Sequence, residues 1–233
     1  METLILLPVK ERSKRLPRKN LRELNGRLMF RHVLYQALRF CSSVKPCSVV
    51  VSTESSEVEH LAKRSMVGIV KRPPWLAEDP ATVIDVTLHA LYQLERRGKP
   101  FDTVMVLMPN CPFTTAGDMK AAFGLYTANG AKWPVMSTVQ ISQPYNPYYS
   151  MMVVMSRLRP LWFANMEKLR DREFPVCWHF NGAIFICPVE MLKEERSFYI
   201  NGTIPYEMPP ERSIDVDTEL DFRIAQCLMQ SKP

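Results

Sequence analysis

Residues 4–20 read LILLPVKERSKRLPRKN, in which a short apolar run, 4–9, passes directly into a basic loop. The run has the length of a buried strand, and similar apolar runs recur at 48–52, 67–70, 103–108, 134–139 and 181–187. Amphipathic, helix-like segments accompany them at 28–40, 58–64, 83–94, 118–126 and 218–229. Strands that alternate with helices predict an α/β fold, in which a mostly parallel central sheet is covered on both faces.

The alternation breaks once, in the segment at about 141–175. It holds Pro144, Pro147 and Pro160 and shows no clean hydrophobic period. We therefore expect a single domain over residues 1–233, with this segment as an arm that leaves the body of the fold.

Composition places the chain among ordinary globular proteins, with 46% hydrophobic and 23% charged residues. The formal net charge of +6 is modest for 233 residues, so no nucleic-acid partner is expected. No run approaches the ~18–20 apolar residues that a membrane helix needs, so no membrane partner is expected either. The six cysteines include no CxxC pair and no histidine at zinc-ligand spacing. We expect them to be reduced and the protein to be cytoplasmic.

Ligands bind at the carboxyl ends of the strands in a parallel sheet, so the loops after Val9, Val51 and Met108 are expected to line one crevice. The first of these loops is strongly basic. Six of the ten residues at 10–19 are Lys or Arg, and only Glu11 opposes them. Such a loop can wrap a triphosphate, because charge-assisted hydrogen bonds to phosphate are strong. A solvated basic turn or a nuclear localisation signal is the alternative interpretation.

A second candidate site is the acidic segment IDVDTELD at 214–221, just before the last helix. Side chains alternate along an extended chain, so Asp215 and Asp217 are expected to point to the same side. Two such carboxylates repel each other unless a cation lies between them, and they suit Mg²⁺ bound together with substrate phosphates. The alternative is an acidic helix start that Asp217 or Thr218 caps. Together, the basic loop and the acidic pair predict a nucleotidyl-transfer site.

Five segments, in this order, resemble the successive motifs of the acylneuraminate cytidylyltransferases, or CMP-sialic acid synthetases. They are SKRLPRKN at 13–20, VVSTE at 50–54, RP at 72–73 with LAED at 76–79, NGAIFI at 181–186 and IDVDTELDF at 214–222. The resemblance implies a Rossmann-like nucleotidyltransferase fold with a dimerisation arm, and hence a homodimer. It also implies CTP and Mg²⁺, a nine-carbon sialic-acid-like sugar (a nonulosonic acid) as acceptor, and a CMP-sugar and pyrophosphate as products.

The same resemblance implies roles for individual residues. Those implied in catalysis are Lys10, Lys19 and Asp217, and those implied at the metal are Asp215 and Asp217. Nucleotide binding is implied for Lys10, Ser13, Lys14, Lys19, Asn20 and Ser52. Sugar binding is implied for Met108, Arg170, Arg172, His179 and Asn181.

Four positions depart from the family pattern. Lys10 stands where the family has an arginine, which keeps the charge but loses the bidentate fork. Glu11 adds a carboxylate that is expected to face the phosphates. Met108 replaces a glutamine, and His179 replaces an arginine that often points at the sugar, with two upstream arginines as candidate substitutes.

These departures leave two alternatives open. One is a catalytically weakened nucleotide-sugar binding protein, which would bind CTP without releasing pyrophosphate. The other is a 3-deoxy-manno-octulosonate cytidylyltransferase, which shares a Ser-x-Arg-x-Pro-x-Lys loop. The Lys19-Asn20 ending of the loop and the segment 218–221 argue against it. Pro112-Phe113 resembles the pseudaminic-acid branch, so the acceptor need not be N-acetylneuraminate.

Overall fold

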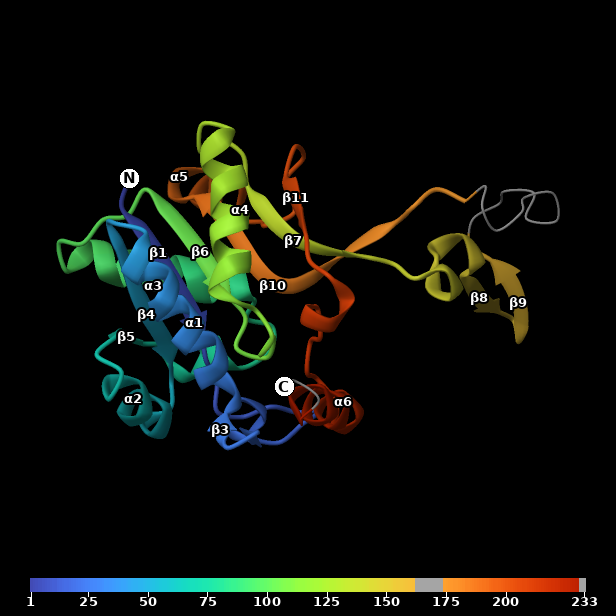
Figure 1. Ribbon diagram of the computed structural model, residues 1–233, viewed down its shortest axis with the longest axis horizontal. Coiled ribbons are helices and arrows are strands. Elements are labelled where there is room, and N and C mark those ends of the chain that lie inside the picture. The colour runs from blue at the N-terminus through green and yellow to red at the C-terminus, as the bar shows by residue number, and fades with distance from the viewer. Residues whose placement is uncertain (162–173, 231–233) are drawn as a thin grey trace.

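The computed structural model describes residues 1–161 and 174–230, and within them seven strands form one central sheet (Figure 1). The strand order across it is β11-β7-β10-β6-β1-β4-β5. These strands are β1 (Thr3–Pro8), β4 (Cys47–Thr53), β5 (Gly68–Lys71), β6 (Thr103–Leu107), β7 (Val135–Gln140), β10 (Trp178–Pro188) and β11 (Ile204–Glu207). Strand β10 runs antiparallel to its neighbours β6 and β7, and the other pairings are parallel. The predicted mostly parallel sheet is confirmed.

Helices cover both faces of the sheet, as predicted. One face packs against α1 (Met29–Ser43), α2 (Ser56–Lys63) and α4 (Ala116–Ala128). The other packs against α3 (Val83–Arg96) and α5 (Val189–Glu195). A third apolar cluster joins the basic loop to α6 (Glu219–Gln230) and to the small hairpin of β2 (Glu23–Leu24) and β3 (Arg27–Leu28). This cluster brings the two ends of the chain together, because Leu16 and Val216 are both buried in it.

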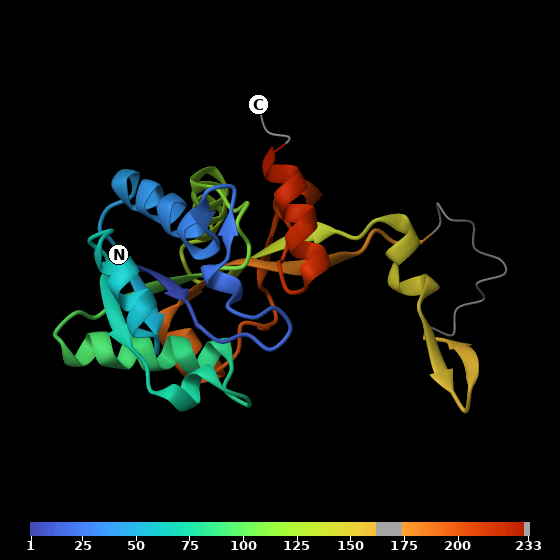
Figure 2. The ribbon, with the colours of Figure 1, turned by 90° about the horizontal axis from the view of Figure 1, so that it is seen from below.

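An arm was expected at about 141–175, and its described part, 141–161 and 174–175, leaves the body of the molecule in both views (Figures 1 and 2). It carries a two-stranded hairpin of β8 (Met151–Val154) and β9 (Arg157–Pro160). Met151, Val153 and Leu158 on this hairpin are exposed. Apolar side chains that stay in solvent on a projecting hairpin indicate a contact surface.

Some elements were not predicted from the sequence. They are α5, β11 and the hairpins, whose short segments carry too little periodicity to stand out. One cysteine expectation is wrong, because Cys41 at the end of α1 and Cys47 at the start of β4 form a disulfide. Their Cα atoms are 5.4 Å apart, since the turn between the helix and the strand brings them together. Across the described residues, no helix combines the length and the apolarity that crossing a bilayer requires.

Candidate active site

A pocket of about 290 Å³ opens at the carboxyl ends of β1, β5 and β6. Its walls come from the basic loop, the loop after β6, the acidic segment and residues 72–86. Sequence analysis predicted the first three of these walls. The loop after Val51 was also expected to line the pocket, but the fourth wall comes from the segment 72–86 and not from that loop. The predicted residues that line the pocket are Lys10, Lys19, Asn20, Met108, Asp215 and Asp217.

The basic loop and the acidic segment meet at Asp217. Both Lys19 and Arg15 form ion pairs with the Asp217 carboxylate, across about 200 residues of sequence. The side chain of Lys19 is only 12% exposed, so this pair is far better shielded from solvent than a surface ion pair. Lys14 pairs with Asp79, another residue of the pocket wall. The predicted meeting of a cationic loop with two acids around one pocket is therefore confirmed.

Asn110 holds the two acids in place from the loop after β6. Its side-chain NH₂ group donates to Asp215 and lies 3.4 Å from an oxygen of Asp217. Its backbone carbonyl accepts the N–H of Val216 at 2.9 Å, and the Val216 side chain is buried on the other side of the chain. This alternation turns both carboxylates into the same pocket, as predicted.

The two carboxylates have different partners, because Lys19 and Arg15 pair with Asp217 whereas Asp215 accepts a hydrogen bond from Asn110. Burial, together with the nearby charge of Asp217, raises the pKa of Asp215 to about 6. Two hard oxygen ligands that line one pocket suit Mg²⁺. Among the described residues, no group of three or more His, Cys, Asp or Glu could hold a metal ion. A site with two carboxylates would suit Mg²⁺, which usually keeps several waters and binds substrate phosphates as well.

Three other nucleotide-binding predictions have different outcomes. Asn20 is almost fully buried, and its NH₂ group donates to the Lys10 carbonyl at 2.8 Å, which ties the two ends of the basic loop together. Ser13 Oγ and Asn20 Oδ1 are shielded from solvent and lack a hydrogen-bond partner within the described part of the chain. Ser52 is fully buried beneath the pocket and does not line it.

Glu11 does not face the pocket, contrary to expectation. Its carboxylate accepts a hydrogen bond from the Ser55 hydroxyl and another from Arg18 at 3.2 Å. These partners draw the acid away from the pocket, because a carboxylate gains more from two donors than from exposure beside other acids. The departure at Glu11 therefore adds no carboxylate to the pocket wall.

The predicted sugar-binding residues do not gather in one place. Met108 lines the pocket, whereas Arg170 and Arg172 lie outside the described residues. His179 is exposed on β10 and is not part of the pocket wall. Asn181 is buried, where it accepts from Ser137 Oγ at 2.6 Å and donates to Ser213 Oγ at 2.8 Å. Its side chain holds β10 against neighbouring segments and does not reach the pocket.

Sequence reasoning missed three residues of the pocket wall, which are Arg15, Arg72 and Asn110. Arg72 lies within the RP motif at 72–73, and Asn110 lies in the loop after β6, which was expected to bind ligand. Their partners are far away in the sequence, so their contacts could not be foreseen. Arg72 donates to the Glu54 carboxylate at 2.7 and 3.0 Å, with its own side chain 3% exposed.

Comparisons with known proteins show which family the sequence matches. The model of a family described as Cytidylyltransferase matches residues 4–158. A CMP-N,N'-diacetyllegionaminic acid synthase from Legionella pneumophila is 28% identical over 99% of this chain and 97% of its own length. An N-acylneuraminate cytidylyltransferase from Streptococcus agalactiae is 26% identical over 95% of this chain and 52% of its own.

A solved structure has a similar fold. A CMP:2-keto-3-deoxy-manno-octonic acid synthetase complexed with CTP superposes with a TM-score of 0.70 over 99% of both chains. Its sequence identity to this chain is 19%, so the likeness concerns the fold alone.

Proposed function

Since this chain belongs to the cytidylyltransferase family, we propose that it transfers a cytidylyl group from CTP to a nine-carbon, sialic-acid-like sugar. The products are the CMP-sugar and pyrophosphate. One observation carries the proposal: Lys19 and Arg15 of the basic loop meet Asp217 of the acidic segment in one pocket. The choice of acceptor is supported by the names of the relatives, which include a legionaminic acid synthase and an acylneuraminate cytidylyltransferase.

The reaction is an in-line displacement at the α-phosphorus of CTP. The anomeric hydroxyl oxygen of the sugar forms the new bond to phosphorus and gives up its proton, while the bond to the β-phosphate oxygen breaks and pyrophosphate leaves. Lys10, Lys14 and Lys19 hold the β- and γ-phosphates, so that the leaving group is neutralised and oriented. The protein therefore contributes mainly position and fixed charge.

Asp215 and Asp217 are the residues that would hold Mg²⁺. When bound, the metal supplies positive charge that neutralises the α-phosphate and makes the attacking hydroxyl more acidic. The contacts of Lys19 and Arg15 with Asp217 hold that carboxylate at the wall of the pocket. They also bring the phosphate-binding cations next to the metal ligands.

The competing function is transfer to 3-deoxy-manno-octulosonate, whose enzymes share a Ser-x-Arg-x-Pro-x-Lys loop. The solved synthetase resembles this chain in fold alone, and the relatives named for nine-carbon acids make this the weaker candidate. A catalytically weakened binding protein is disfavoured, because Glu11 turns away from the pocket and adds no carboxylate to its wall.

The experiment is to measure pyrophosphate release from CTP with four acceptors: N-acetylneuraminic acid, N,N'-diacetyllegionaminic acid, pseudaminic acid and 3-deoxy-manno-octulosonic acid. Release with a nine-carbon acid that depends on Mg²⁺ supports the proposal. Asp217→Asn should lower the rate by roughly 10²–10³, by analogy with other preorganised electrostatic groups. Glu190→Gln on α5, an exposed acid outside the pocket, is the matched control and should leave the rate unchanged. Binding of CTP without release for any acceptor would contradict the proposal.

We also propose that the chain forms a homodimer through β8 and β9. The exposure of Met151, Val153 and Leu158 on this projecting hairpin supports the proposal. A cytoplasmic location belongs to the same proposal, since CTP is a cytoplasmic metabolite. Sedimentation of the full chain should give a dimer, and Val153→Asp with Leu158→Asp should shift it to a monomer.

A further inference from the structure

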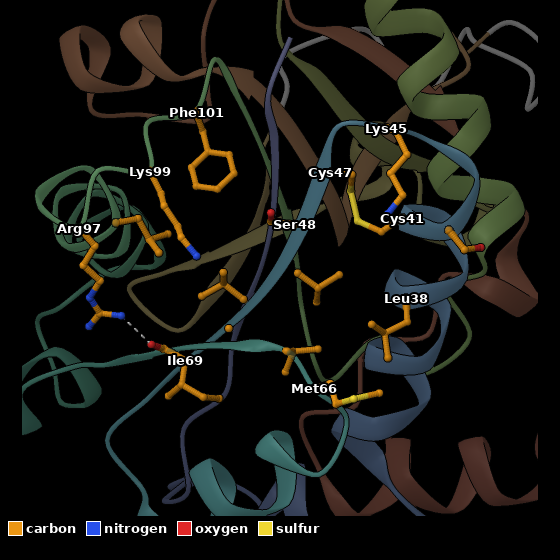
Figure 3. Close-up of a pocket in the computed structure, with 16 residues that line it drawn as sticks. Leu38, Cys41, Lys45, Cys47, Ser48, Met66, Ile69, Arg97, Lys99 and Phe101 are labelled. Carbon is orange, nitrogen blue, oxygen red and sulfur yellow. Dashed lines mark hydrogen bonds between the residues drawn. A yellow bond between two sulfur atoms is a disulfide. The ribbon is translucent and has the colours of Figure 1, made fainter.

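A second pocket, of about 470 Å³, lies at the other end of the sheet (Figure 3). It is built from the end of α1, the amino ends of β4 and β5, and the segment that connects α3 to β6. Phe101 lines this pocket just before β6, whereas Met108 lines the candidate active site just after it. At ~3.3 Å per residue of strand, the two pockets are about 20 Å apart. A ligand in this pocket would therefore not touch the candidate active site.

The walls of this second pocket carry one sign of charge. Lys45, Arg97 and Lys99 line it, and no Asp or Glu of the described residues does. Arg97 is fixed in place because it donates to the Ile69 carbonyl at 3.0 Å. Figure 3 shows Lys45 and Lys99 entering from opposite sides.

These cations are also uncompensated. In the residues that the structure describes, neither Lys45 nor Lys99 pairs with a carboxylate, unlike Lys14 and Lys19 in the candidate active site. Unpaired charge of one sign inside a concave wall attracts a ligand of the opposite sign.

The remaining wall is apolar. Leu38, Ile69 and Phe101 contribute side chains to it, together with residues of β4. A free inorganic anion would leave this apolar wall uncovered, and a neutral apolar compound would leave the cations at the rim without a counterion. The combination fits a molecule that has both an anionic group and an apolar body, in a volume usual for small-ligand sites.

The disulfide makes this pocket rigid. Cys41 and Cys47 both line it, and their bond closes the short loop that carries Lys45. A loop tied at both ends loses less freedom when a ligand binds, so more of the contact energy is available as affinity. The backbone of the loop that carries Lys45 is therefore restrained before a ligand arrives.

We propose that this second pocket is a ligand site for a small organic anion with an apolar body, separate from the cytidylyl-transfer site. The proposal does not depend on the proposed function, because none of its residues belongs to the candidate active site.

The test uses the full chain and a fluorescent probe of this chemistry, 8-anilinonaphthalene-1-sulfonate. We expect saturable binding of one probe per chain, unaffected by CTP. Lys99→Met should weaken binding roughly tenfold, the usual value of a hydrogen bond to a charged group. Lys45→Met should act in the same direction. Lys132→Met, an exposed lysine outside the pocket, is the control and should have no effect.

A second probe separates charge from apolar contact. N-phenyl-1-naphthylamine has the same rings without the sulfonate, so Lys99→Met should leave its binding unchanged. The proposal is overturned if both lysine variants bind the sulfonated probe like the parent chain, which would place the probe elsewhere, for example on the exposed apolar hairpin of the arm. It is also overturned if CTP displaces the probe. Thermal unfolding of each variant checks that the fold is retained.

Discussion

Glu54 and Arg72 form an ion pair that is almost closed to solvent, with Arg72 Nη2 2.7 Å from a carboxylate oxygen of Glu54. The other oxygen of Glu54 accepts the backbone N–H of Glu11 at 2.9 Å. Arg72 lines the candidate active site, and Glu11 follows Lys10 in the basic loop. One carboxylate therefore fixes the position of two walls of the pocket relative to each other, without itself lining the pocket.

Glu54→Gln should uncouple these two walls. The amide keeps an acceptor for Glu11 but leaves Arg72 as a buried charge without its counterion, and breaking such a pair costs about 3 kcal/mol of unfolding free energy. We expect a higher KM for CTP, with a smaller effect on kcat, because the phosphate-binding loop is less well positioned. Urea unfolding and steady-state kinetics measure the two effects.

The control for this prediction is Glu57→Gln, which removes the exposed pair with Arg18 on the same side of the basic loop. An exposed pair contributes less than about 1 kcal/mol, so this variant should resemble the parent chain. Equal losses in the two variants would show that Glu54 has no special positioning role.

The sequence permits prediction of those parts of the site whose chemistry is local. The basic loop and the Asp-x-Asp pair are contiguous patterns, so their positions at strand and helix ends could be predicted, and so could their same-side geometry. The contacts of Glu54 with Arg72 and of Asn110 with Asp215 could not. Each joins two loops that meet only when the sheet has formed.

Asn181 is a residue that the sequence did single out, but the direction of its side chain could not be predicted. A family motif predicted that it contacts the sugar, but its side chain is turned into hydrogen bonds with Ser137 and Ser213. The next residue, Gly182, has a φ of 75°, a left-handed conformation that redirects β10 at this point. Local backbone geometry of this kind decides where a side chain points, and sequence pattern alone does not contain it.

Asp118 connects α4 to the turn that precedes the acidic segment. It accepts hydrogen bonds from Arg212 at 2.9 Å and Tyr206 at 2.9 Å, and with Thr115 it forms the capping box of α4. Burial would raise the pKa of Asp118, but the hydrogen bonds from Arg212, Thr115 and Tyr206 outweigh it and hold the pKa below its ordinary value.

Asp118→Asn should therefore lower the unfolding free energy by about 3 kcal/mol at neutral pH, because Arg212 loses a buried counterion. A carboxyl with a lowered pKa stabilises the fold above its unfolded pKa of about 4, and this stabilisation disappears as the pH falls further. The difference between parent and variant should be constant from pH 7 to about pH 5 and shrink below pH 4. Urea unfolding across this range measures it.

The matched control is Asp85→Asn, which alters the equivalent capping box of α3 with Thr82. Asp85 is more exposed than Asp118, and its ion pair with Arg196 is longer, at 3.6 Å. The loss of unfolding free energy should therefore be only about 1 kcal/mol. If the two variants lose equal stability, the Asp118 effect comes from helix capping alone and not from Arg212.

The disulfide should stabilise the chain, although its loop is short. For a loop closed between Cys41 and Cys47, the chain-entropy model gives about 2 kcal/mol. Tris(2-carboxyethyl)phosphine should therefore lower the melting temperature of the parent chain. The double variant Cys41→Ser with Cys47→Ser should melt lower and should not respond to the reductant. A parent chain whose melting temperature is the same with and without reductant would show that the bond is absent in solution.

Asn110→Asp tests the metal ligands without measuring activity. The substitution places a third carboxylate beside Asp215 and Asp217, where the pKa of Asp215 is already raised by burial and like charge. We expect the variant to melt below the parent chain without metal, and to recover when MgCl₂ is added. A ligand at 100 times its Kd stabilises by about 2.7 kcal/mol, and the parent should gain less because it lacks the third carboxylate. Asn201→Asp, in an exposed turn, should show no such recovery. If MgCl₂ shifts Asn110→Asp no more than Asn201→Asp, the two aspartates do not hold the metal.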